Sequence, residues 1–193
     1  MKQNRRQIQK EATRKKIVET AVKVYSRDGF SAPSNVVAIE AGVAHGTVFV
    51  HFPTTGDLLM AVLQRFFIQM LGKLHDLSES SGIDDFLRGH IEILQSCEDF
   101  YKRLLTEARL LPEEARGTLE SIRSVALQHF TSAAEYETRR GAVKDVPIDV
   151  MFNAWLGLVH YYMQNMGGPG PGESVLGRYK GELVSNFSAL IKK

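Results

Sequence analysis

The chain has 193 residues, a formal net charge of +2 and a hydrophobic content of 44%. This length fits one large domain or two small ones, and the apolar content is high enough to build a buried core. The single cysteine, Cys97, excludes an intramolecular disulfide and a cysteine-rich zinc site. No apolar run is long enough to span a membrane, and the charged N-terminus leads into no signal-peptide core. We therefore expect a cytoplasmic protein with no membrane partner.

The positive charge is concentrated at the N-terminus, where residues 1–16 contain seven basic residues and one acid. The basic residues are Lys2, Arg5, Arg6, Lys10, Arg14, Lys15 and Lys16. Such a segment can be a terminus that only aids solubility. Beside a DNA-binding motif, it instead indicates contacts with phosphates.

Apolar residues recur at spacings of three and four along almost the whole chain, which predicts an all-α protein of about nine helices. The first helix is expected over residues 9–27 and ends at Asp28-Gly29. A short helix over residues 34–41, a turn at Gly42 and another short helix over residues 45–51 follow. This order and spacing are typical of a helix-turn-helix.

The remaining helices are expected over residues 56–77, 83–96, 98–110, 112–139, 148–166 and 173–191, with breaks at 78–82, 141–147 and 167–172. Thr54 or Thr55 can cap the fourth helix. The helix over residues 148–166 is apolar on all sides, so both its faces must be covered. The core of the same chain can cover one face of this helix while a second copy of the chain covers the other face. Alternatively, both faces can pack inside the core of a monomer.

The N-terminal third resembles the DNA-binding domain of the TetR family of bacterial transcriptional regulators. The resemblance rests on Thr-Arg-Lys-Lys-Ile-Val at 13–18, Asp-Gly-Phe at 28–30, Val-Ala-Ile-Glu-Ala-Gly-Val at 37–43, Gly-Thr-Val-Phe-Val-His-Phe-Pro at 46–53 and Asp-Leu-Leu at 57–59. It implies a DNA-binding domain over residues 1–54 and a ligand-binding and dimerisation domain over residues 55–193, with the fourth helix (56–77) as connector. It also implies a homodimeric repressor that a small-molecule effector releases from a palindromic double-stranded DNA operator.

The side chains expected at the DNA interface belong to the basic arm, the start of the second helix, the third helix and the loop before the fourth. They are Arg5, Arg6, Lys10, Arg14, Ser34, Asn35, Ala44, His45, Gly46, Thr47, Phe49, Val50, His51, Thr54 and Thr55. Of these, His45 and Val50 are expected to reach base edges. His51 is expected to orient against a phosphate or to pack under Phe52.

Three positions depart from the family's pattern. The usual Ser that caps the third helix is Ala44, the usual Tyr of that helix is Phe49, and the usual Lys before the fourth helix is Thr55. Each lost phosphate partner should flatten the salt dependence of DNA binding by up to about one unit. Two alternatives therefore stay open: a DNA binder controlled by a protein partner, and a dimeric small-molecule-binding protein with a vestigial DNA-binding head.

The resemblance further implies a ligand pocket and a dimer interface in the C-terminal two thirds. Candidates for the pocket are Phe66, Met70, His90, Leu94, Phe100, Leu104, Phe130, Trp155 and Tyr162. Candidates for the dimer interface are Ala154, Gly157, Leu158, Tyr161, Tyr179, Leu183 and Phe187. The few charges on the inward faces favour a largely apolar ligand. Since the chain lacks the spacings of catalytic, metal and phosphate-binding motifs, we expect no enzyme, metal site or cofactor.

Overall fold

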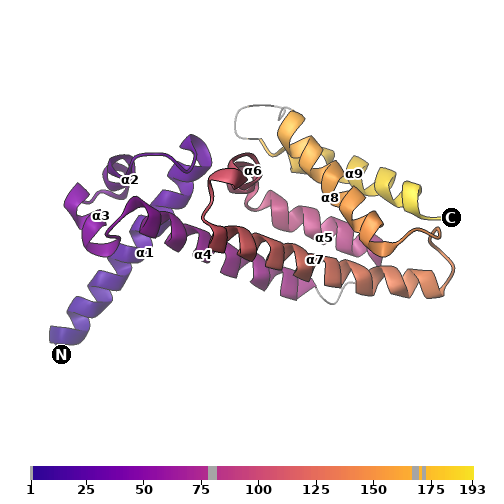
Figure 1. Ribbon diagram of the computed structural model, residues 1–193, viewed down its shortest axis with the longest axis horizontal. Helices are drawn as coiled ribbons and strands as arrows, with labels where there is room; N and C mark the ends of the chain where they lie inside the picture. The colour runs from indigo at the N-terminus through magenta and orange to yellow at the C-terminus, as the bar shows by residue number, and fades with distance from the viewer. Residues whose placement is uncertain (1, 78–81, 167–169, 171–172) are drawn as a thin grey trace. The chain divides into compact units, whose positions relative to one another are not determined.

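The computed structural model describes residues 2–77, 82–166, 170 and 173–193. Within these residues it contains nine α-helices and one short 3-10 turn, and no strand (Figure 1). The prediction of an all-α fold is therefore confirmed. The breaks expected at 78–82 and 167–172 lie largely outside the described residues.

The helices follow the expected order along the chain. They are α1 (Lys2–Asp28), α2 (Ser34–Ala41), α3 (His45–His51), α4 (Thr55–Asp76), α5 (Ile83–Gln95), α6 (Glu98–Glu107), the 3-10 turn Ala108–Leu110, α7 (Glu113–Arg139), α8 (Ile148–Asn165) and α9 (Val175–Ile191). The bounds of α2 and α3 are those predicted. In contrast, α1 begins at Lys2 rather than near residue 9, because its first residues are mostly good helix formers and Gln7 donates a hydrogen bond of 2.9 Å to Glu11 one turn later. The helix expected to reach residue 110 ends at Glu107 and continues as the 3-10 turn.

The chain divides into two compact units. Unit 1 contains Met1–Phe66 and Asp99–Ala115, and unit 2 contains Phe67–Glu98 and Arg116–Lys193. Unit 1 therefore extends past residue 54, the end expected for the DNA-binding domain. It takes in the first half of α4 and most of α6.

The core of unit 1 forms where α1, α2 and α3 meet. Ile17, Ala21 and Tyr25 of α1 are almost fully buried, as are Val37 of α2 and Val48 of α3. These positions recur along α1 at spacings of four, which places them on one face of the helix. The packing of α1 and the two short helices around one apolar centre fixes the direction in which α3 presents its other face.

The end of α1 is held by side chains of α6. Glu107 accepts a hydrogen bond of 2.9 Å from the backbone N–H of Phe30, and Arg103 donates to carbonyl oxygens in the last turn of α1. Gly29 between them has φ +89°, and a Cβ there would lie 2.7 Å from the Glu107 carboxylate. Both the left-handed backbone and the close approach of Glu107 require glycine at this position. This contact explains why residues of α6 belong to unit 1.

Unit 2 is built from α5, α7, α8 and α9 with the second half of α4. Its core contains aromatic rings from three helices: Phe86 of α5, Phe130 of α7, and Phe152 and Trp155 of α8. At the end of α9, Lys192 lies 2.9 Å from Asp84 and 3.6 Å from Glu137. These ion pairs join the end of α9 to the start of α5 and to α7.

Among the described residues, no single helix has the length and apolar character needed to cross a membrane. The bent pair of α3 and α4, with 67° between them, meets that test of length and composition only when the two helices are taken together.

Candidate nucleic-acid interface

The turn between α2 and α3 is built on Gly42. Its φ of +62° is the left-handed conformation that favours glycine, and its N–H bonds to the carbonyl of Ile39 at 3.0 Å. The N–H of Val43 bonds to the carbonyl of Ala38 at 3.0 Å, which completes the closing turn of α2. The helix-turn-helix that the sequence predicted is therefore present in unit 1, and its two helices, α2 and α3, have the expected length.

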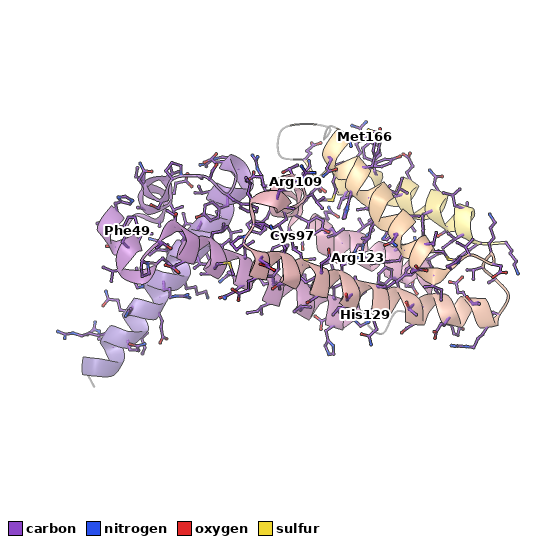
Figure 2. The ribbon with its side chains drawn as sticks, viewed as in Figure 1. Phe49, Cys97, Arg109, Arg123, His129 and Met166 are labelled. Carbon is purple, nitrogen blue, oxygen red and sulfur yellow. The ribbon has the colours of Figure 1, made fainter. Side chains whose placement is uncertain are left out.

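One side of α3 is anchored in unit 1 and the other faces solvent. Val48 is 1% exposed and Phe52, directly after α3, is 2% exposed. Val50 is 72% exposed and His45 is also exposed. Phe49, labelled in Figure 2, is 41% exposed. Gly46 is exposed and Thr47 is half-buried, so the outward face of α3 is close to the one predicted.

His45 is exposed but its ring is held in place. Its Nε2 lies 3.1 Å from the hydroxyl oxygen of Ser34, and its ring meets that of Phe49 edge to face, with 5.0 Å between centroids. Ser34, the first residue of α2, is only 7% exposed. The expectation that Ser34 itself contacts DNA is therefore wrong, because its buried hydroxyl is directed to His45. Sequence periodicity gives no sign of this pair, since the two residues belong to different helices.

His51 does not lie on the exposed face of α3. Its Nδ1 is buried without a hydrogen-bond partner in the described part of the chain, and its ring lies 6.4 Å from that of Phe52. Burial lowers the pKa of His51 below its ordinary value, and the positive charges of Lys10 and Arg14 lower it further. Both effects disfavour the charged imidazole, and the role of His51 at a DNA interface stays a prediction.

The basic side chains of α1 lie on the same side of unit 1 as the end of α3. The guanidinium of Arg14 lies 4.9 Å from the centre of the Phe52 ring, a distance typical of a cation–π contact. Lys10, one turn earlier, is close enough to act on the His51 pKa. Arg5 and Arg6 are exposed on the N-terminal turns of α1, which extend beyond the other helices of unit 1 (Figure 1). The arm expected from the sequence is therefore helical, and part of it borders α3.

The loop before α4 uses its threonines in different ways. Thr54 caps α4: its hydroxyl accepts from the N–H of Asp57 at 3.0 Å, and its own N–H donates to the Asp57 carboxylate at 2.9 Å. This reciprocal pairing is a capping box. Thr54 is therefore the capping residue of the two that the sequence allowed, while Thr55 is exposed at the first position of α4. Ala44 caps α3 with no side-chain hydrogen bond, and Asn35 is exposed.

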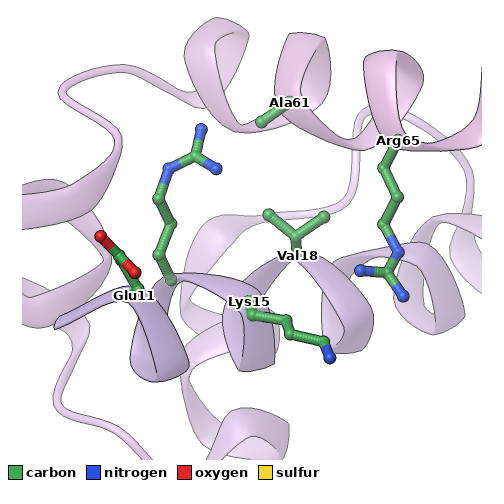
Figure 3. Close-up of a pocket in the computed structure, with 6 residues that line it drawn as sticks. Glu11, Lys15, Val18, Ala61 and Arg65 are labelled. Carbon is green, nitrogen blue, oxygen red and sulfur yellow. The ribbon is translucent and has the colours of Figure 1, made fainter. Parts of the chain in front are cut away.

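An open groove of about 240 Å³ lies between α1 and α4 within unit 1 (Figure 3). It is lined by Glu11, Arg14, Lys15, Val18, Ala61 and Arg65. Arg65 pairs with Glu19 at 2.9 Å, and Lys15 lies 4.0 Å from the same carboxylate. Glu11 and Glu19 partly balance the positive charges around the groove, and the ion pair of Arg65 with Glu19 links α4 to α1.

The residues predicted to line one ligand pocket are divided between the two units. Phe66, Phe100 and Leu104 are buried in unit 1, where the Phe66 and Phe100 rings lie 4.8 Å apart. The members buried in unit 2 are Met70, His90, Leu94, Phe130 and Trp155. Tyr162 is half-buried at the surface of unit 2, where its hydroxyl donates to Glu182 at 3.2 Å. Its place in a pocket stays a prediction.

His90 is the polar centre of the aromatic core of unit 2. Its Nδ1 accepts a hydrogen bond of 3.2 Å from the indole N–H of Trp155, and its ring stacks on Phe86 at 5.5 Å. Burial lowers the pKa of His90 to about 3. His90 is therefore neutral at pH 7, and its partner is the tryptophan.

The predicted dimer residues of α8 form an exposed stripe. Ala154 and Gly157 are exposed, Leu158 is half-buried and Tyr161 is 55% exposed, while Val150 at the start of the same stripe is 50% exposed. On α9, Tyr179 is half-buried. Leu183 and Phe187 are 1% and 2% exposed, so their expected place in an interface is wrong. They face the core of unit 2 because α9 turns its apolar strip toward α5 and α8.

No protein-family model and no curated protein matches the sequence. Solved structures do match over nearly the whole chain, and many are named TetR-family regulators. A TetR-family regulator from Agrobacterium tumefaciens is 15% identical, with 95% of this chain and 100% of that chain covered and a TM-score of 0.77. A putative transcriptional regulator from Saccharomonospora viridis, in complex with choline, is 18% identical, with 95% and 99% covered and a TM-score of 0.75.

A structure named superantigen PfiT is also similar, at 18% identity, with 95% of this chain and 97% of that chain covered and a TM-score of 0.70. Proteins with different names thus share this architecture, and function has to be argued from the site. Taken with the helix-turn-helix in unit 1, the comparisons show that the chain has the fold of the TetR family of transcriptional regulators.

Proposed function

We propose that the chain is a homodimeric transcriptional regulator that binds a palindromic DNA operator in the cytoplasm through α3 of each copy. The observation that carries this proposal is the face of α3 that exposes His45, Phe49 and Val50 while Val48 is anchored in unit 1. A short helix that is fixed on one side and exposed on the other suits the major groove of DNA.

The charge distribution supports the same proposal. Arg5, Arg6 and Lys10 are exposed on α1, and Arg14 lies beside the end of α3. Basic side chains around a groove-reading helix neutralise phosphates and release counterions, which provides affinity without sequence preference. The base-reading helix and the phosphate-binding arm would then act together, because both belong to unit 1.

The exposed stripe on α8 supports a two-fold dimer. Ala154 and Gly157 are small enough for two helices to approach closely, and Val150 and Tyr161 add exposed apolar surface on either side. A second copy that packs the same stripe against this one would cover these side chains. Such a dimer presents two copies of α3 and therefore matches an operator with two equivalent halves.

We further propose that a small, largely apolar molecule binds in unit 2 and releases the operator. The interior of unit 2 is aromatic, and its buried histidine, His90, is neutral. The complex of a structural neighbour with choline supports a small-molecule effector for this fold. Binding would act as a population shift toward dimers whose two α3 helices do not fit successive major grooves, with α4 as the connecting element.

A charge-reversal variant separates this function from a ligand-binding protein with a vestigial head. Arg14→Glu with Lys16→Glu should abolish binding to random-sequence DNA, measured by fluorescence anisotropy at low salt. The matched control is Arg139→Glu with Arg140→Glu, which changes the net charge by the same amount at the exposed end of α7. Equal binding by both double variants would contradict the proposal. If DNA binding holds but responds to no small molecule, control by a protein partner is the remaining function.

A further inference from the structure

His45 is an exposed side chain with an unusually fixed orientation. A ring at the surface of a short helix normally samples several rotamers. Here Nε2 lies 3.1 Å from the Ser34 hydroxyl, and the Phe49 ring meets the imidazole at 69° on the same helix. Ser34 is 7% exposed, so the anchor for the ring lies inside unit 1.

The hydrogen bond to Ser34 decides which ring nitrogen is left for a ligand. It uses Nε2, so Nδ1 is the nitrogen that remains. A neutral imidazole carries one proton, and when the Ser34 hydroxyl donates to Nε2 that proton is on Nδ1. A protonated ring also has a proton on Nδ1. In both of these states Nδ1 is a donor, whereas a neutral ring that donates from Nε2 to the Ser34 oxygen would have Nδ1 as an acceptor.

We propose that the Ser34 hydroxyl donates to Nε2 of His45 and so sets its ring, and that His45 is a specificity-determining residue that donates from Nδ1 to N7 of a purine in the major groove. This inference rests on the proposed DNA-binding function. Guanine and adenine both present N7 as an acceptor in the major groove, whereas cytosine presents a donor and thymine presents O4 instead of N7. The proposal therefore places a purine, and not a cytosine, opposite His45 in each half-site, and the loss of N7 tests that contact.

Phe49 contributes to the same arrangement. The ring packs on His45 with 5.0 Å between centroids, a contact that needs no hydroxyl group. A ring that is ordered before DNA arrives loses less conformational freedom on binding. The contacts from Ser34 and Phe49 thus hold the His45 ring in one orientation before it binds a base.

The test uses purine analogues that lack N7. Each purine of the operator half-site is replaced singly by its 7-deaza form, which keeps Watson–Crick pairing, and the affinity of the full-length protein is measured. The wild-type protein should lose about threefold to tenfold in affinity at one purine, as expected for one hydrogen bond. His45→Ala should show no loss at that purine, and Ser34→Ala should show a smaller loss than wild type.

Ser31→Ala is the matched control, because Ser31 is an exposed serine in the loop just before α2. It should keep the wild-type response at every position. Thermal unfolding of each variant shows whether Ser34→Ala is folded; His45 is exposed, so His45→Ala tests the base contact independently.

The outcomes separate this inference from the function on which it rests. A wild-type protein that is folded and prefers no DNA site would overturn the proposed function and this inference with it. A preferred site at which wild type and His45→Ala respond alike to every analogue would overturn the inference alone. Full analogue sensitivity in folded Ser34→Ala would overturn the positioning role of Ser34.

Discussion

Replacing Glu98 with Ala should destabilise unit 2, because this side chain holds the start of α9. Its carboxylate accepts hydrogen bonds from the hydroxyl of Ser174 at 2.5 Å, from the N–H of Val175 at 2.9 Å and from the N–H of Leu176 at 3.3 Å. The first N–H groups of a helix have no partner inside the helix. Glu98 supplies that partner from the start of α6, 77 residues earlier in the sequence than Val175.

The expected loss follows from the burial of these donors. Val175 and Leu176 are 1% and 0% exposed, and Glu98 itself is 7% exposed, so water reaches the unpaired groups poorly. A buried donor left without a partner costs about 1–3 kcal/mol. Since the Leu176 bond is long, we expect a total of about 3 kcal/mol for Glu98→Ala. In a chain of this size that corresponds to a fall in Tm of about 6–12 °C.

Two further variants serve as comparisons for the loss of stability in Glu98→Ala. Glu98→Gln keeps one acceptor oxygen and should lose only about 1 kcal/mol. Glu92→Ala is the matched control, because Glu92 also pairs with a residue of α9, Lys180, but its side chain is 62% exposed. An exposed ion pair contributes about 1 kcal/mol or less. The free energy of unfolding can be followed in urea by the fluorescence of Trp155, and equal losses for Glu98→Ala and Glu92→Ala would refute the role of Glu98.

Four other predictions concern the interface, the dimer and the core. Val50→Ala should weaken binding to the operator more than binding to random DNA if this exposed side chain contacts bases, as we propose; equal losses in anisotropy titrations would show that it does not contact them. Phe49→Tyr should tighten DNA binding at moderate salt, because it adds the hydroxyl of the Tyr that is usual in the family and this hydroxyl can reach a phosphate. An unchanged affinity would mean that the ring does not reach a phosphate. Ala154→Arg should convert the proposed dimer to a monomer in sedimentation experiments by placing a charge in the α8 stripe; a dimer that persists would show that the interface lies elsewhere. Because the pKa of His90 is about 3 in the folded chain against 6.5 ordinarily, the unfolded chain takes up a proton that the folded chain does not as the pH falls from 6.5 toward 3. Stability should therefore fall across this window, and His90→Gln, which keeps an acceptor for Trp155, should show a smaller fall in Tm between pH 7 and pH 4.

The helix-turn-helix of α2 and α3 could be predicted from the sequence because the residues that indicate it lie within or directly beside the two helices. Gly42 marks the turn, Pro33 and Pro53 flank the two short helices, and apolar spacing identifies Val48 as the anchor of α3. Each of these signals acts within a few residues, so the bounds of α2 and α3 follow from it.

The contacts between distant residues could not be predicted in this way. Both α8 and α9 carry apolar residues that periodicity alone cannot assign to a core or to an interface. Periodicity therefore does not show that Leu183 and Phe187 lie in the core and not in a dimer interface. The pairing of Ser34 with His45 depends on the angle between α2 and α3. The contact of Glu98 with the start of α9 depends on how whole helices pack. No spacing rule describes such contacts.

The central claim is that α3 reads an operator, and the most direct test is selection from genomic DNA. Purified full-length protein is mixed at moderate salt with fragmented DNA from its own genome, and the bound fragments are recovered and sequenced. The account predicts enrichment of a palindromic site whose half-sites are separated by one turn of DNA or a multiple of it. A folded dimer that enriches no site would contradict it.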